Sequence, residues 1–264
     1  MESPIPALEI VAHRGASFDA PENTLAAVAL AWQQQSDAVE IDVRVTKDQK
    51  IVAMHDADTQ RTCDGSLVVA DTTYAEIQKL DACNGKGKKY AGERVPLLAE
   101  ILATIPPSGQ LFVEVKCGDE IINPLVDQLT QHADRQSQVV LIGFNSPLLA
   151  KIKIELPRVA ALLCAALPDK KSTIWGRRDI ENLVTTAKQM NFDGVDLDAR
   201  AMISRDAVDR LRDEKLRCYF WTVDEPVRAR DLARCGVDGV TTNRPGWLKS
   251  ELERDSPMGD GKSP

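Results

Sequence analysis

Three acidic residues stand where strand alternation would turn them toward the inside of a fold. Glu40 and Asp42 alternate with valine and isoleucine in AVEIDVRV, and Glu114 lies between two valines in LFVEVKC. Successive side chains of a strand point to opposite faces, so the three carboxylates should share the inner face. A buried carboxylate is costly unless it is paired or binds a metal. The set predicts an oxygen-only site for Mg²⁺, Ca²⁺ or Mn²⁺ rather than zinc, with an ion-pair network to Arg44 and Lys116 as the alternative.

Two of the three histidines end apolar runs that read as strands. His13 follows the first run and His55 follows a hairpin after the second, whereas His132 stands among polar residues of a predicted helix and is expected at the surface. Imidazole changes its charge near neutral pH, so a pair can serve as acid and base in one reaction. With Arg14 and Lys116 nearby, the set indicates phosphoryl transfer, in which cations spread the phosphate charge. Chemistry with Lys116 as a nucleophile is the alternative.

Three further residues are candidates for binding a substrate. Asp196 shares a strand with a second aspartate and could reach the mouth of the site, or it could be a structural partner of a cation. Trp221 could form an apolar wall for a small polyol, and a core tryptophan is the alternative. Glu22 could bridge an arginine or a substrate hydroxyl. Its alternative is a loop that opens a helix, with Asn23 or Thr24 as the N-cap.

Eight short apolar runs alternate with segments of helical periodicity along the chain. The runs are 10–13, 38–45, 111–117, 139–144, 159–164, 194–198, 216–223 and 236–242. The helical segments are 24–34, 97–105, 121–133, 147–156, 180–190, 205–214, 226–235 and 245–252. This alternation predicts an α/β fold, a single (β/α)₈ TIM barrel, with a doubly wound open sheet as the alternative. In a barrel the loops after the strands form the active site, which is where both candidate histidines fall.

One domain is expected over residues 1–252, because no low-complexity linker divides the chain. About forty residues, at 56–96, read as an insertion after the second strand, with one short helix at 73–80. The preceding 51–55 is expected to pair back onto that strand as a hairpin. Long connections at this end of a barrel usually shape the substrate site. The polar segment 253–264 is expected to be a disordered tail.

Composition excludes several classes of partner. The formal net charge is −7 and no long basic run is present, which argues against nucleic acid and membrane surfaces as partners. The chain shows neither a signal-peptide pattern nor eighteen consecutive apolar residues, so we expect no stable membrane insertion and a cytoplasmic location. Six cysteines without a C-x-x-C pair predict reduced thiols. The oligomeric state cannot be predicted from these features.

Seven segments, taken in order and spacing, resemble the glycerophosphodiester phosphodiesterase family over nearly the whole chain. They are AHRG at 12–15, PENT at 21–24, EIDV at 40–43, VAMHD at 52–56, VPLLAE at 95–100, EVK at 114–116 and GVDGVTTNRP at 236–245. The resemblance implies hydrolysis of a small-molecule glycerophosphodiester to glycerol phosphate and an alcohol, with a cyclic phosphate as the expected intermediate. A sphingomyelinase D-like phospholipase is one alternative. A non-catalytic barrel that binds a metal or a polyol phosphate is another.

The resemblance also implies roles for individual residues. His13 and His55 would be the acid and base, Glu40, Asp42 and Glu114 would hold one Mg²⁺ or Ca²⁺, and Arg14 and Lys116 would contact phosphate. Which histidine acts first as the acid does not follow. The chain departs from the family pattern at Asn243, where many relatives carry Asp, and the acids of the sixth strand do not align with a family role. The preferred alcohol is therefore left open.

Overall fold

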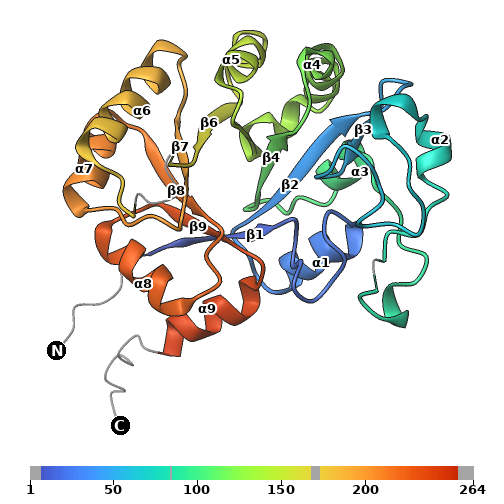
Figure 1. Ribbon diagram of the computed structural model, residues 1–264, viewed down its shortest axis with the longest axis horizontal. Coiled ribbons are helices and arrows are strands. Elements are labelled where there is room, and N and C mark those ends of the chain that lie inside the picture. Colours follow the sequence, from blue (N-terminus) through green and yellow to red (C-terminus); the bar gives the residue numbers. More distant parts are fainter. Residues whose placement is uncertain (1–6, 84, 168–172, 255–264) are drawn as a thin grey trace.

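Eight parallel strands form a closed barrel in the computed structural model, which describes residues 7–83, 85–167 and 173–254 (Figure 1). The barrel strands are β1 (Glu9–His13), β2 (Ala38–Val45), β4 (Gln110–Val115), β5 (Val139–Gly143), β6 (Ala160–Ala165), β7 (Gly194–Asp198), β8 (Arg217–Trp221) and β9 (Gly239–Thr242). Strand β1 pairs with both β2 and β9, and this double pairing closes the ring. The predicted TIM barrel is confirmed, and the open sheet is excluded.

Helices alternate with the strands and cover the outside of the barrel (Figure 1). They are α1 (Leu25–Gln33), α3 (Leu98–Leu102), α4 (Ile122–Gln131), α5 (Ser146–Glu155), α6 (Arg177–Gln189), α7 (Arg205–Asp213), α8 (Pro226–Cys235) and α9 (Pro245–Arg254). The run predicted as a strand from residue 236 begins only at Gly239, because Gly236 takes a left-handed conformation (φ 88°) and ends α8. Helix α9 reaches two residues past the expected boundary at 252, and residues 255–264 of the expected tail lie outside the described residues.

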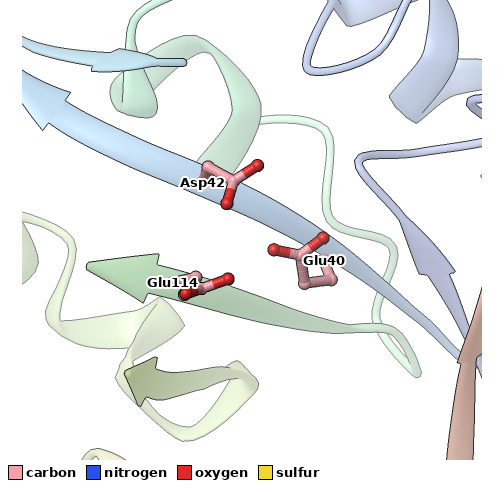
Figure 2. Close-up of side chains that lie close together, drawn as sticks. All are labelled: Glu40, Asp42 and Glu114. Atoms are coloured by element: carbon pink, nitrogen blue, oxygen red, sulfur yellow. The ribbon is translucent and has the colours of Figure 1, made fainter. Parts of the chain in front are cut away.

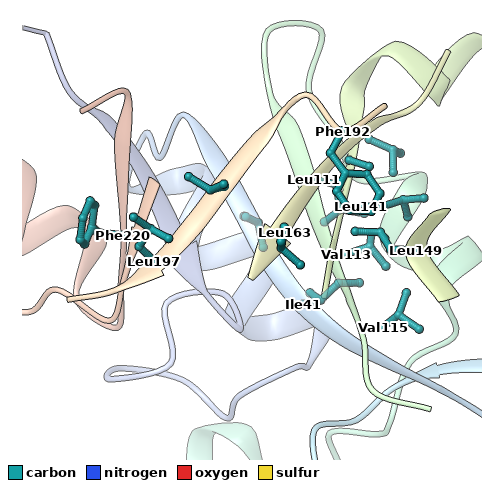
Figure 3. Packing of buried hydrophobic residues seen from close by; sticks show 14 of the residues in the cluster. Ile41, Leu111, Val113, Val115, Leu141, Leu149, Leu163, Phe192, Leu197 and Phe220 are labelled. Carbon is teal, nitrogen blue, oxygen red and sulfur yellow. The ribbon is translucent and has the colours of Figure 1, made fainter. Parts of the chain in front are cut away.

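Two apolar cores lie on the two sides of the barrel wall. Val39, Ile41 and Val43 of β2 belong to the outer core between strands and helices, part of which is drawn in Figure 3. Inside the barrel a smaller cluster includes Phe112 and Tyr219, whose rings meet edge to face with centroids 5.1 Å apart. Because side chains alternate along β2, its two acids point into the barrel, as predicted.

The segment between β2 and α3 begins with the predicted hairpin. Strand β3 (Ile51–Ala53) pairs antiparallel with β2, and short helices follow at η1 (Val69–Asp71), α2 (Tyr74–Ile77) and η2 (Lys88–Tyr90). A small core of its own, which includes Met54, holds this segment beside the barrel, near β2 and β3 in Figure 1. That residues 56–96 are an insertion relative to other barrels stays a prediction.

The six cysteines are free thiols, of which Cys164 and Cys218 are buried and the others half-buried. No disulfide therefore contributes to the fold among these residues. Among the described helices, none combines the length and the apolar character that a membrane span requires.

Candidate active site

The three predicted carboxylates meet inside the barrel near the carboxyl ends of β2 and β4 (Figure 2). Asp42 and Glu114 are register partners on these neighbouring strands, and Glu40 lies one inward position earlier on β2. One oxygen from each carboxylate lies within 4.8 Å of the other two. Glu40 and Asp42 are 2% and 0% exposed, so their charges are removed from water. The structure thus brings together all three residues of the predicted metal site.

The carboxylates are incompletely paired. Glu40 Oε2 accepts a hydrogen bond from the backbone N–H of Arg14 (2.9 Å), but Glu40 Oε1 and Asp42 Oδ1 are buried and have no hydrogen-bond partner among the described residues. Burial raises the pKa of Glu40 well above its usual range, and the charges of Asp42 and Glu114 raise it further. Burial and Asp42 likewise raise the pKa of Glu114. Orphaned buried oxygens with mutually repelling charges are what a hard cation would satisfy.

Two cations border the carboxylates. Arg14 Nε lies 3.0 Å from Asp42 Oδ2, and Lys116 Nζ lies 2.9 Å from Glu114 Oε1 and 3.7 Å from Asp42 Oδ1. The alternative ion-pair network therefore exists in part, but it does not use Arg44. That side chain donates to the backbone carbonyl of His55 from Nε (3.0 Å) and Nη2 (2.9 Å). The alternative is therefore wrong for Arg44, because the backbone carbonyl of His55 in the hairpin accepts its hydrogen bonds.

A tight turn at the end of β1 aims Arg14 at the acids. Arg14 and Gly15 both have positive φ (54° and 77°), which turns the chain sharply after His13. A Cβ on Gly15 would come within 2.5 Å of the backbone of Ala27, so only glycine fits there. This turn directs the Arg14 N–H toward Glu40 and its guanidinium toward the rest of the cluster.

Glu22 joins two arginines instead of lining the main pocket. Its carboxylate accepts hydrogen bonds from Arg14 Nη1 (2.8 Å) and from Nη1 (2.7 Å) and Nη2 (2.8 Å) of Arg61. Although burial raises it, the hydrogen bonds from Arg61 and the charge of Arg14 lower the pKa of Glu22 to about 2. The side chain is therefore an anion that holds Arg14 in place.

Asn23 clamps Asp42, a contact that sequence reasoning missed. Asn23 Nδ2 donates to Asp42 Oδ2, and Asn23 Oδ1 accepts from the Asp42 backbone N–H, both at 3.0 Å. The N-cap of α1 is Thr24, whose hydroxyl accepts from Ala27 N. The two polar residues that open this helix thus have separate tasks.

Nδ1 of each candidate histidine contacts a neighbouring side chain, and Nε2 is the ring nitrogen outside that contact. His13 Nδ1 lies 2.7 Å from Asn243 Oδ1, and His55 Nδ1 lies 2.7 Å from Asp56 Oδ1. His13 Nε2 is 4.0 Å from Glu40 Oε2, beyond hydrogen-bond distance. The two imidazoles therefore have different supports, a neutral amide and a carboxylate.

These supports correspond to different electrostatic surroundings. Burial, followed by the nearby charge of Arg14, lowers the pKa of His13, although the hydrogen bond with Asn243 opposes this. Burial alone would raise the pKa of Asp56, but hydrogen bonds from His55 and Arg61 outweigh burial and lower it. Asp56 is thus an anion beside one imidazole, and the other imidazole has no equivalent at its Nδ1.

A pocket of about 260 Å³ connects these groups at the barrel mouth. It is lined by His13, Arg14, Glu40, His55, Glu114, Lys116, Ile142, Phe144, Cys164, Asp196, Trp221, Thr222 and Thr241. Both histidines, both phosphate-binding candidates and two of the three acids therefore face one space. The third acid, Asp42, lies directly behind them.

The remaining candidate residues lie either in the wall of the pocket or at its rim. Asp196 is 2% exposed at the pocket, and its Oδ1 has no hydrogen-bond partner in the part of the chain that the structure describes. Burial, followed by the charge of Glu114, raises its pKa well above its usual range. Trp221 is a half-buried wall residue whose ring meets Phe144 edge to face at 5.6 Å, and its Nε1 donates to the Asp196 carbonyl (3.2 Å). Asp198, by contrast, pairs with the exposed Arg200 at the rim.

His132 lies away from this pocket, at the C-terminal end of α4. Its Nδ1 contacts the carbonyl oxygen of Gln128 (2.9 Å), and the residue is half-buried. The expected surface position is therefore only partly right.

Sequence reasoning missed several supporting residues. The contacts made by Phe144, Asn23, Asp224 and the histidine partner Asn243 were not predicted. Arg61 was not predicted either, and it lies within residues 56–96, the segment expected to be an insertion. A polar residue directly after a strand was an available signal for Asn243.

A closed (β/α)₈ barrel whose acids, cations and two imidazoles meet at the carboxyl ends of its strands has the arrangement of a TIM-barrel enzyme. Comparison with known proteins gives the family. The model of the glycerophosphoryl diester phosphodiesterase family matches residues 13–247. The chain belongs to this family, and the predicted enzyme class, a phosphoric diester hydrolase, is confirmed.

Relatives resemble the chain over most of its length. It is 29% identical over 245 residues to a glycerophosphodiester phosphodiesterase of Caldanaerobacter subterraneus, a match that covers 90% of this chain and 95% of the relative. It is 30% identical over 251 residues to a glycerophosphodiester phosphodiesterase of Bacillus subtilis, covering 89% and 83%. Among solved structures, a phosphodiesterase of Oleispira antarctica in complex with the product sn-glycerol-3-phosphate superposes with a TM-score of 0.82 at 28% identity, covering 93% and 96%.

Proposed function

We propose that the protein hydrolyses glycerophosphodiesters to glycerol phosphate and a free alcohol, with His13 and His55 as its acid and base. The observation that carries this proposal is that two imidazoles, each held through Nδ1, face one pocket with an incompletely paired carboxylate cluster. The product bound to the Oleispira antarctica relative supports the choice of substrate. Its substrate is therefore a small molecule.

Glu40, Asp42 and Glu114 would hold one divalent cation. Their oxygens are close enough together, and the orphaned atoms of Glu40 and Asp42 would become ligands. Oxygen-only donors suit Mg²⁺ or Ca²⁺, and Mn²⁺ is also compatible. Such an ion, when bound, neutralises charge on a phosphoryl oxygen. Arg14 and Lys116 add positive charge at the same place, and Glu22 positions Arg14.

The proton transfers of the two half-reactions return each imidazole to its starting protonation state. One imidazole Nε2 takes the proton of the glycerol hydroxyl next to the ester, whose oxygen bonds to phosphorus as the bond to the alcohol breaks. The other imidazole gives its Nε2 proton to the departing alcohol. In the second half a water loses a proton to the imidazole that has just given one. The water oxygen bonds to phosphorus, the ring P–O bond breaks, and the first imidazole returns its proton to the freed hydroxyl.

Asp196 and Trp221 would contact the rest of the substrate. Burial raises the pKa of the Asp196 carboxyl well above its usual range, which favours the protonated form that can donate a hydrogen bond to a hydroxyl. Trp221 and Phe144 form the apolar wall beside it. These assignments leave the alcohol head group open. A single catalytic domain over 1–252 and a cytoplasmic location stay predictions from the sequence.

One assay tests the proposal. The full-length chain is incubated with glycerophosphocholine and Mg²⁺ or Ca²⁺, and free choline and glycerol phosphate are measured. Equal release of both is expected, with loss of turnover after chelation and recovery when the cation returns. Release of phosphocholine and glycerol would show that the other ester bond breaks. Cleavage of sphingomyelin in place of glycerophosphocholine would favour the sphingomyelinase D-like alternative, and no release of either product would favour the binding protein.

A further inference from the structure

A chain of hydrogen bonds runs from the loop after β8 to His13. Asn243 Oδ1 lies 2.7 Å from His13 Nδ1, and Asn243 Nδ2 donates to Asp224 Oδ2, also at 2.7 Å. Asp224 Oδ1 accepts from the Asn243 backbone N–H (2.8 Å) and from the Thr242 hydroxyl (2.9 Å). These hydrogen bonds therefore join the end of β9, the loop after β8 and the end of β1.

The direction of each hydrogen bond in this series is determined by groups that can only donate, such as backbone N–H, or only accept, such as a carboxylate. The backbone N–H of Arg244 donates to Thr242 Oγ1 (3.2 Å), so the Thr242 hydroxyl proton is directed to Asp224. A carboxylate can only accept, which turns the NH₂ of Asn243 toward Asp224 and its carbonyl oxygen toward His13. The hydroxyl of Ser17 also donates to that carbonyl oxygen (3.0 Å). His13 must then carry a proton on Nδ1.

We infer that Asp224, acting through Asn243, is a positioning residue that keeps His13 in the tautomer with its proton on Nδ1 and its Nε2 lone pair in the pocket. The inference rests on the proposed function and deepens it, because it makes His13 the imidazole that takes the first proton. It then leaves the first proton donation to His55, whose Nδ1 is bound by the carboxylate of Asp56 instead of an amide.

The substitution Asp224→Asn should reverse the direction of the hydrogen bonds that join residue 224, Asn243 and His13. The new amide must keep its oxygen toward the Asn243 backbone N–H and the Thr242 hydroxyl, so its NH₂ faces Asn243. Asn243 would turn its own oxygen toward that NH₂ and its NH₂ toward His13. The proton of His13 would then move to Nε2, where it blocks removal of the substrate proton. In serine proteases the corresponding change of tautomer costs about 10⁴-fold in kcat.

The tautomer can be read without any assay of activity. Long-range ¹H–¹⁵N NMR of the full-length chain, at a pH where His13 is neutral, should place its proton on Nδ1 in the wild type and on Nε2 in Asp224→Asn. A wild-type proton on Nε2 overturns the inference even if no variant folds. Absence of hydrolysis by the wild type with its proton on Nδ1 would instead count against the proposed function.

A double exchange provides the decisive comparison. In Asp224→Asn/Asn243→Asp the amide and the carboxylate are exchanged, so an oxygen at position 243, now of a carboxylate, again accepts from His13 Nδ1. We expect kcat to fall at least ~10²-fold in Asp224→Asn with KM within ~3-fold, and to recover at least ~10-fold in the double variant. Asp209→Asn, an exposed aspartate paired with Arg212 on α7, is the matched control and should keep the wild-type kcat. An Asp224→Asn enzyme with wild-type kcat, or a double variant as slow as the single one, would overturn the inference.

Discussion

The mouth of the barrel has two unlike arcs. The arc built by β1, β2 and β4 carries His13, Arg14, Glu40, Glu114 and Lys116. The arc built by β5 to β8 presents Ile142, Phe144, Cys164 and Trp221, with Asp196 as the one acid among the described residues that line the pocket there. We refer to them as the charged arc and the apolar arc. The difference fits the proposed function, in which bond breaking would take place against the first arc and the second would contact the part of the substrate that needs little polar recognition.

Large apolar side chains are exposed beside both arcs. Among the described residues they are Phe144 (50%), Ile174 (55%), Met202 (49%) and Val227 (68%) on the segments that follow β5 to β8, and Phe18 (55%) and Val68 (49%) on the segments that follow β1 and β3. The charged arc is distinguished by the ion pairs of its side chains, such as those of Arg14 and Lys116.

Removing a carboxylate from the charged arc should have the largest effect. We expect Glu40→Gln and Glu114→Gln each to lose bound metal and at least ~10³-fold in kcat/KM, since the cation and its charge stabilisation are lost together. Metal content and kcat/KM are measured on the same samples. Glu155→Gln, an exposed residue at the end of α5, is the matched control. Full metal occupancy in both site variants would show that these acids are not the ligands.

Removing the attacking hydroxyl of the substrate should come next. An analogue of glycerophosphocholine without the hydroxyl on the carbon next to the ester should be hydrolysed at least ~10³-fold more slowly, because an intramolecular nucleophile gains an effective molarity of up to ~10⁵ M or more. The quantity to compare is kcat at saturating metal. Equal kcat for the two substrates would eliminate the cyclic phosphate and favour direct attack by water.

Replacing the histidines tests whether proton transfer and metal binding are separate tasks of the charged arc. His13→Ala and His55→Ala should each lower kcat by ~10²-fold or more while metal content stays near that of the wild type. The reason is that both rings are held by an amide or a carboxylate, outside the cluster of three acids. Variants that lost metal but kept turnover at saturating metal would invert the assigned roles.

Substitutions in the apolar arc should have the smallest effect, and mainly on binding. We expect Trp221→Ala and Phe144→Ala to raise KM about 2- to 10-fold with kcat within ~3-fold, the scale of one edge-to-face aromatic contact. Ile154→Ala, exposed on α5, serves as the control. A loss of kcat as large as that of the histidine variants would remove the functional difference between the arcs.

The sequence predicted the charged arc better than the apolar one for a physical reason. Acids at alternate strand positions are costly inside a barrel, so Glu40, Asp42 and Glu114 stood out against their apolar neighbours. An apolar wall is made of the same residue types as the core, and Phe144 therefore carried no signal. The hydrogen bond of Asn243 with Asp224 could not be predicted either, because it depends on where two separate loops end in space.

Boundaries failed where a single residue decides the backbone. The last strand begins later than predicted because Gly236 ends α8 in a left-handed conformation, which the hydrophobic pattern does not reveal. Asn23 is a similar case, because its positive φ (57°) directs the side chain to Asp42 and away from the N-cap position of the helix that follows. Local sequence thus indicated the elements, whereas the backbone conformation of Gly236 and the contact of Asn23 with Asp42 decided these two details.

The register of β2 with β4 has a consequence for how such an enzyme could be redesigned. Asp42 faces Glu114 through backbone pairing of two central strands, and Glu40 is one inward step away on the same strand. Their spacing is therefore inherited from the sheet and does not depend on any surface loop. Loops of the apolar arc could be lengthened, shortened or exchanged to accept a different alcohol, while the three carboxylates would keep their mutual distances.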